Sequence, residues 1–102
     1  MNDKTANPDV DNQFYDRADA HIILANDQLA EIDNRGQVSA SMMYATARFN
    51  AWVSAFGWDS AEEMAAAKKE TVEYIVSEFR KMLNEHLDDY IENFSDYMDP
   101  EQ

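Results

Sequence analysis

The segment EHLDDYIENF, residues 85–94, gathers four carboxylates, a histidine and a tyrosine within ten positions. Such a set could bind a metal ion or transfer protons. At about 100° per residue of a helix, however, all four carboxylates lie on the side opposite Leu83, where a helix faces solvent. Inward-pointing metal motifs pair Glu-x-x-His, and position 83 is Leu where that motif needs Glu. We therefore expect a solvated acidic interaction face without a metal, formed by Glu85, Asp88, Asp89 and Glu92, with His86 at the edge of the apolar stripe.

His21 is the second residue with chemical potential. It lies near the middle of an apolar pattern that runs from Phe14 to Ile32, so we expect its side chain to point inward. A buried histidine held by one or two hydrogen bonds is the simpler interpretation, and a ligand-binding residue or general base is the alternative.

Arg48 is the only charged residue in positions 38–57, which we expect to form the central helix. A cation beside an apolar face needs a carboxylate or several carbonyl partners, and the candidates are Asp16 or Asp19 on the first helix and acids on the third helix. A structural ion pair is therefore expected, with an anion-binding pocket as the alternative. The residues that would form such a polar core or pocket are His21, Arg48, Asp19 and His86.

The composition excludes several classes of function. The chain has no cysteine, which excludes disulfides, thiolate metal sites and cysteine nucleophiles. With 21 acidic and 8 basic residues, the net charge of −13 opposes direct binding to nucleic acid and favours a basic protein partner. No phosphate-binding loop or catalytic triad spacing occurs, so we expect no cofactor. The N-terminal residues do not resemble a signal peptide and no run of about 20 apolar residues could cross a membrane, so a cytoplasmic protein is expected.

Helical periodicity predicts an all-α fold with three helices in a single domain, residues 1–102. The first helix is expected to begin at Asn7-Pro8 and to end near Asp33, where Gly36 would take the left-handed conformation. The second is expected from Ser39 to about Phe56, buried on much of its circumference. The third, about residues 61–94, begins with a capping box of Ser60 and Glu63. Residues 1–7 and 95–102 are expected to be frayed tails.

The expected third helix carries a long apolar stripe. Its members are spaced 4-3-4-4-3-4, which makes two eleven-residue repeats with a period of about 3.67 residues. A helix of roughly 51 Å would extend about two dozen ångströms beyond the second, and the stripe continues along this overhang. Either the first helix or a second copy of the chain must cover it, and we expect a homodimer. The stripe consists of Val72, Val76, Phe79, Leu83, Leu87, Tyr90 and Phe94.

Three segments together resemble a known family: FYDRADAHIILAN (14–26), VSASMMYATARFNAW (38–52) and MLNEHLDDYIENF (82–94). The chain is similar to small acidic bacterial proteins grouped as a domain of unknown function. The resemblance implies an all-helical cytoplasmic protein and transfers no catalytic residue. The polar positions that match the family pattern are Arg17, Asp19, Asn26, Arg48, Asn50, Asp88, Asp89 and Asn93.

Three functions are compatible with these patterns. The first is a non-catalytic interaction or regulatory module that offers its acidic surface to a protein partner. The second is a small enzyme or ligand-binding protein with a polar pocket around His21 and Arg48. The third is an acidic mimic of nucleic acid that binds a basic protein. The absence of recognisable catalytic motifs and the one-signed charge favour the first.

Overall fold

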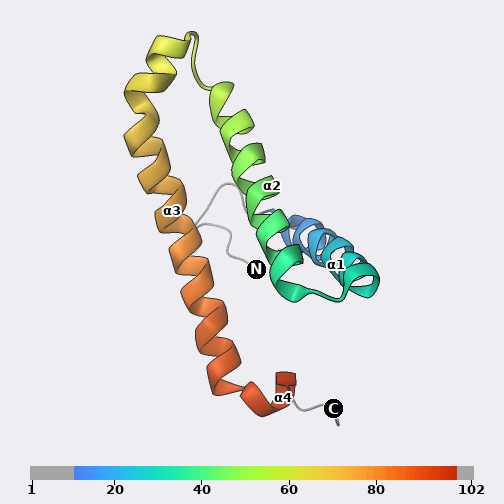
Figure 1. Ribbon diagram of the computed structural model, residues 1–102. Helices are drawn as coiled ribbons and strands as arrows, with labels where there is room; N and C mark the ends of the chain where they lie inside the picture. Colours follow the sequence, from blue (N-terminus) through green and yellow to red (C-terminus); the bar gives the residue numbers. More distant parts are fainter. Residues whose placement is uncertain (1–10, 99–102) are drawn as a thin grey trace. The chain divides into compact units, whose positions relative to one another are not determined.

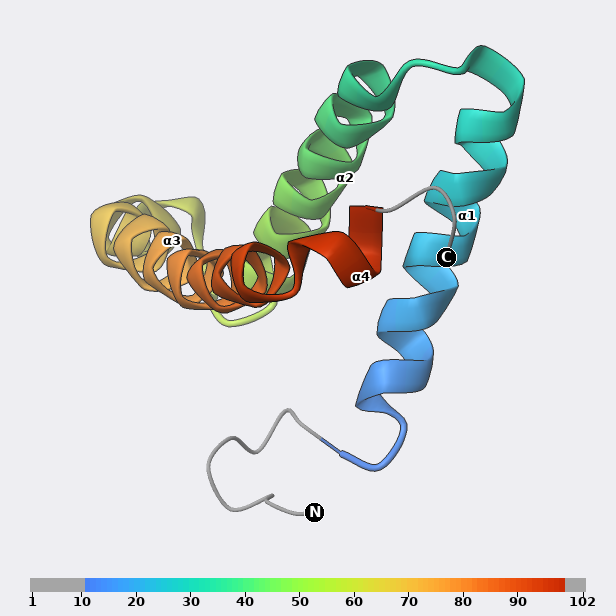
Figure 2. The same cartoon turned by 90° about the horizontal axis from the view of Figure 1, so that it is seen from below.

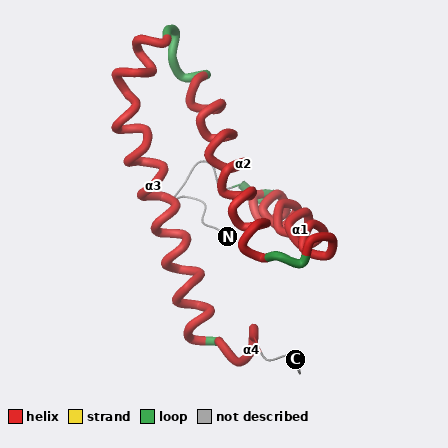
Figure 3. Tube along the Cα trace, viewed as in Figure 1, coloured by secondary structure: helices red, strands yellow, loops and turns green. Residues whose placement is uncertain are grey.

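In the computed structural model, the structure describes residues 11–98, and every regular element among them is a helix (Figure 3). The expected all-α fold with a long C-terminal helix is confirmed. The expected tail at residues 1–7 lies outside the described residues. Along the chain, the helices are α1 (Phe14–Ile32), α2 (Arg35–Ala55), α3 (Ala61–Glu92) and α4 (Phe94–Met98) (Figure 1).

The contacts between residues divide the chain into two compact units. The first unit, Met1–Ala51, contains α1 and most of α2. The second unit, Trp52–Gln102, contains the last turn of α2 together with α3 and α4.

The described part of the first unit begins with a turn around Asp11. One carboxylate oxygen of Asp11 accepts a hydrogen bond from the backbone N–H of Gln13 at 2.8 Å, and the other pairs with Arg17 at 3.2 Å. The N–H bond and then the guanidinium lower the pKa of Asp11. This bonding therefore stabilises the turn at pH values above the usual pKa of a carboxyl group. The stabilisation is lost as the pH falls through the lowered pKa of Asp11. Because residues 11–13 form this turn, α1 starts at Phe14, and the expected start at Asn7-Pro8 is wrong.

The connection between α1 and α2 contains a left-handed residue, but it is not the expected Gly36. Asp33 adopts the left-handed conformation, with φ of 53°, and its N–H donates to the carbonyl oxygen of Leu29 at 2.8 Å. Gly36 instead lies inside α2. The side-chain oxygen of Asn34 accepts from the N–H of Gln37 at 3.0 Å, so α2 begins four residues before the expected Ser39. Short Asp and Asn side chains suit both roles, because they tolerate the left-handed region and bond nearby N–H groups.

Most of α2 is exposed, contrary to the expectation of a buried central helix. Val38 is the only buried side chain among the described residues, with 5% of its surface exposed. Tyr44 and Phe49 are 70% and 61% exposed. A low charge density alone does not bury a helix, because burial also requires a neighbour that covers it.

The start of α3 agrees with the expected capping box. Ser60 is the N-cap residue, and its hydroxyl oxygen accepts from the backbone N–H of Glu63 at 3.1 Å. The Glu63 carboxylate in return accepts from the N–H of Asp59 at 2.9 Å. Two N–H groups at this helix end are thereby satisfied, which fixes where α3 begins.

We predict that Ser60→Ala lowers the free energy of unfolding by about 1 kcal/mol, because the N–H of Glu63 loses its partner. Urea denaturation followed by circular dichroism measures this change. Ser77→Ala removes the same hydroxyl from an exposed position inside α3 and should be neutral or slightly stabilising. Equal losses in both variants would contradict the capping role.

The apolar stripe of α3 is about half exposed. Phe79, Leu83 and Tyr90 have 45%, 44% and 46% of their surface exposed. The half-buried positions of the first five turns lie on a different stripe, about a third of a turn away. The half-exposed apolar residues are called the α3 stripe, which is defined as Val72, Val76, Phe79, Leu83, Leu87 and Tyr90. The half-buried set consists of Met64, Ala67, Thr71, Ile75 and Glu78.

The chain turns sharply after α3. Asn93 is the C-cap residue of α3, and α4 follows at once from Phe94 to Met98 (Figure 2). Residues 95–98, which we expected in a frayed tail, are thus helical, whereas residues 99–102 lie outside the described part. None of the described helices combines the length and apolar character needed to cross a bilayer.

Candidate functional site

The corner between α3 and α4 is held by one carboxylate. Asp89 accepts a hydrogen bond from the side-chain amide of Asn93 at 2.8 Å on one oxygen. Its other oxygen accepts from the hydroxyl of Tyr97 at 2.5 Å. The backbone carbonyl of Asp89 also accepts from the backbone N–H of Asn93 at 2.9 Å. Asp89 therefore holds the C-cap residue of α3 and ties α4 to α3.

The aromatic rings of Tyr90 and Tyr97 complete this corner. Their centroids lie 4.1 Å apart with 19° between the planes, which is a stacked arrangement. The hydrogen bond to Asp89, followed by burial and the nearby carboxylates, raises the pKa of Tyr97 above its usual value of 10.0. The phenol is therefore fully protonated at neutral pH and acts as a hydrogen-bond donor. The corner is built for structural support and not for proton transfer at neutral pH.

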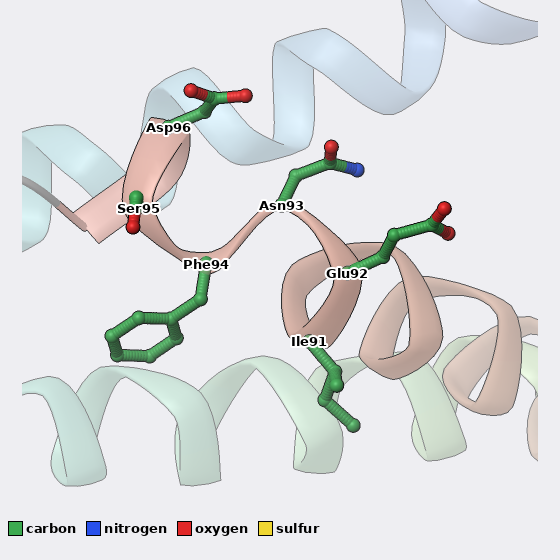
Figure 4. A pocket seen from close by; sticks show the side chains of 6 residues that line it. All are labelled: Ile91, Glu92, Asn93, Phe94, Ser95 and Asp96. Atoms are coloured by element: carbon green, nitrogen blue, oxygen red, sulfur yellow. The ribbon is translucent and has the colours of Figure 1, made fainter.

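A shallow pocket of about 250 Å³ lies at the same corner (Figure 4). Ile91 and Phe94 point to one side of the backbone, while Glu92, Asn93 and Asp96 point to the other. The pocket is smaller than the usual range of about 300–1,000 Å³ for ligand sites. Consecutive residues line it, so it is the hollow of the turn between two helices.

The acidic interaction face is exposed at three of its four positions. Glu85, Asp88 and Glu92 are exposed along α3. Asp89 is half-buried, and both of its oxygens are used within the corner. Among residues 11–98, no group of three or more His, Asp and Glu side chains lies close enough to hold a metal ion. The carboxylates available to a partner are therefore those of Glu85, Asp88 and Glu92.

The expected polar core is not buried. His21 and Asp19 are exposed on α1, Arg48 is exposed on α2, and His86 is exposed on α3. The expectation that His21 points into a core is wrong, because its helix neighbours Ile22 and Leu24 are also more than half exposed.

Arg48 has no carboxylate within ion-pair distance among the described residues. The ion pair expected for it, with Asp16 or Asp19 as the partner, does not form there. The corner pocket of the second unit contains none of the four proposed pocket residues.

Sequence reasoning missed Tyr97, because it assigned the residue to a tail. A signal was nevertheless present. Asp89, Asn93 and Tyr97 follow one another at steps of four residues, which places them along one side of a helix. A carboxylate followed four residues later by an amide and eight residues later by a phenol is the pattern that forms the corner.

The chain belongs to the family described as "Protein of unknown function (DUF3144)", whose model matches residues 14–91, which confirms the family resemblance. It is also similar to a protein from Shewanella sp, NB7890A, whose structure was solved by NMR. The two are 42% identical, with a TM-score of 0.73, and the match covers 86% of this chain and 93% of the other. A comparison with curated proteins finds no match. Neither description names an activity.

Proposed function

We propose that the chain, as a member of a family of unknown function, is a non-catalytic protein-interaction module that acts in the cytoplasm. One observation carries the proposal. Among the described residues a single apolar side chain, Val38, is buried, whereas 24 large apolar side chains are exposed. Apolar surface of this extent is typical of chains that bind other chains. The exposed faces of α2 and α3 are therefore proposed as binding surfaces.

The charge of α3 indicates the type of protein that this module selects. Glu85, Asp88 and Glu92 are exposed, and no lysine or arginine follows Lys81 in the sequence. A surface of one sign attracts a partner of the opposite sign and suppresses association with other acidic proteins. The proposed partner is consequently a protein with a basic surface.

The alternative of an enzyme with a pocket around His21 and Arg48 has less support. Both side chains are exposed, so neither is held in the water-excluded environment that tunes catalytic groups. The nucleic-acid mimic shares the acidic face of the proposed module and differs only in its partner. The identity of a captured basic protein distinguishes the mimic from a general interaction module.

Affinity purification of the tagged chain from its native cells, at low and high salt, tests the proposal. We predict a reproducible basic partner that is captured at low salt and released at high salt. The triple variant Glu85→Gln, Asp88→Asn and Glu92→Gln should reduce this capture several-fold at low salt, because three exposed charges are removed.

The matched control removes three exposed charges elsewhere, by Asp27→Asn, Glu31→Gln and Glu70→Gln. It should capture the partner nearly as well as the unmodified chain. Equal losses in the two triple variants would show that only net charge matters and would contradict a specific acidic face. Recovery of the chain alone with a bound small molecule would overturn the interaction module.

A further inference from the structure

The α3 stripe runs along one face of α3 from Val72 to Tyr90, and its six side chains are about half exposed. We infer that a second copy of the chain packs on it, with the two α3 helices antiparallel and a two-fold axis at Leu83. This inference deepens the proposed function and rests on it in one respect, namely that exposed apolar faces are binding surfaces.

The spacing of the stripe is symmetric about Leu83. From Val76 to Tyr90 the steps are 3-4-4-3, which read the same in both directions. An antiparallel pair related by a two-fold axis places Leu83 against Leu83 of the second copy. In the same register, Phe79 faces Leu87, and Val76 faces Tyr90. Each apolar layer from Val76 to Tyr90 therefore meets an apolar layer of the other copy, whereas Val72 has no counterpart within α3.

The sizes of the side chains favour the antiparallel direction. Antiparallel pairing places the small Val76 against the large Tyr90, and Phe79 against the medium-sized Leu87. Parallel pairing would place Tyr90 against Tyr90 and Val76 against Val76, with crowding at one end and a gap at the other. Helices pack closely where large and small side chains alternate across the interface.

The area of the stripe is close to that of a small specific interface. The five side chains that pair in this register, from Val76 to Tyr90, are between 44% and 50% exposed. With aromatic side chains that bury about 150–250 Å² each when fully covered, their exposed part is roughly 450 Å² per copy. Two copies would bury roughly 900 Å² from these side chains, close to the about 1,000 Å² expected of a specific interface.

The charge distribution along α3 also favours the antiparallel arrangement. Between positions 85 and 96 the chain carries five acidic residues and neither lysine nor arginine, whereas positions 68–81 carry four basic and three acidic residues. Parallel helices would place the two acidic segments side by side. Antiparallel helices keep the two acidic segments at opposite ends of the pair, although the acidic side chains themselves point away from the stripe, and they also oppose the helix dipoles.

The α3–α4 corner prepares one end of this interface. Tyr90 lies in the α3 stripe, and Tyr97 stacks on one face of its ring. Since Asp89 fixes Tyr97, the orientation of Tyr90 is set before a second copy binds. The corner therefore supports binding by holding an aromatic anchor in place.

Cysteine cross-linking tests the register and direction, because the chain contains no cysteine of its own. Leu83→Cys, Val76→Cys and Tyr90→Cys are each introduced singly and treated with a short bismaleimide reagent. We predict that Leu83→Cys cross-links with itself in most molecules, because this position lies on the two-fold axis. Val76→Cys and Tyr90→Cys should cross-link less than one-tenth as well alone, and should cross-link efficiently when the two variants are mixed.

The control Tyr74→Cys lies on the opposite side of α3 and should not cross-link. Self-cross-linking of Val76→Cys and Tyr90→Cys would overturn the antiparallel arrangement. Light scattering measures the molar mass of the unmodified chain and needs no variant. A monomer at micromolar concentration would overturn the inference that a second copy packs on the α3 stripe. That monomer result would leave the interaction module intact, since the module fails only if no partner is captured.

Discussion

Leu83→Asp is expected to convert the dimer into a monomer at micromolar concentration. The position lies on the inferred two-fold axis, so one substitution changes the interface twice. Leu83 is already half covered in a single chain, and each copy therefore loses about 1 kcal/mol of apolar burial. Burying a carboxylate in its place costs at least about 1 kcal/mol more per copy, so the dissociation constant should rise about 1,000-fold.

Size-exclusion chromatography with light scattering measures this change over a range of concentrations. Thermal unfolding gives a second readout, since the melting temperature of a dimer rises with chain concentration and that of a monomer does not. Tyr74→Asp adds the same charge on the opposite side of α3, where the side chain is 62% exposed, and should remain dimeric. A dimeric Leu83→Asp variant would show that the α3 stripe is not the interface.

Local helix signals explain how much of the fold could be predicted. The contacts that start α3 involve Ser60 and Glu63, three residues apart, so the sequence pattern alone identified them. The start of α2 was harder to locate, because Ser39 and Asn34 are both good capping residues. Only the conformation of Asp33 decides in favour of Asn34.

Burial was predicted less well than helix position, for a physical reason. Periodicity identifies which face of a helix is apolar, but it does not identify the element that covers that face. His21 and Arg48 were assigned to a core on the assumption that the three helices pack on one another. Both are exposed, and the large apolar residues of α2 and α3 are exposed with them. In the proposed interaction module other chains would cover the apolar faces, so an apolar pattern need not mark a core within the chain itself.

The acidic segment shows what a pattern of residue types can and cannot resolve. Helical phase places Glu85, Asp88 and Glu92 on a different side of α3 from the α3 stripe, and all three are exposed. It could not separate Asp89 from them, because the distinction depends on the turn at Asn93 and on the position of Tyr97. One carboxylate of four thus has a structural role that composition does not reveal.

Asp89→Ala is expected to release α4 from α3. The substitution removes the acceptor for the Asn93 amide and for the Tyr97 hydroxyl at the same time. A helix of five residues is too short to persist in water without such contacts. Hydrogen exchange should show loss of protection at residues 94–98, and the near-ultraviolet circular dichroism of the stacked tyrosines should decrease.

The alkaline titration of Tyr97 provides an independent measurement. Its raised pKa means that the docked corner favours the neutral phenol, so docking is fully stable below pH 10 and weakens as the pH rises through the raised value. In Asp89→Ala the pKa should return towards 10.0 and this alkaline transition should disappear.

Asp88→Ala is the matched control for this prediction, because it removes the neighbouring carboxylate, which is exposed and makes no contact with Tyr97. Protection of α4 and the titration of Tyr97 should be unchanged in it, and equal effects in the two variants would contradict the role of Asp89. Since Tyr97 orients Tyr90, Asp89→Ala should also weaken self-association several-fold. Asp89→Ala should not abolish self-association as Leu83→Asp does, because the other residues of the α3 stripe stay in place.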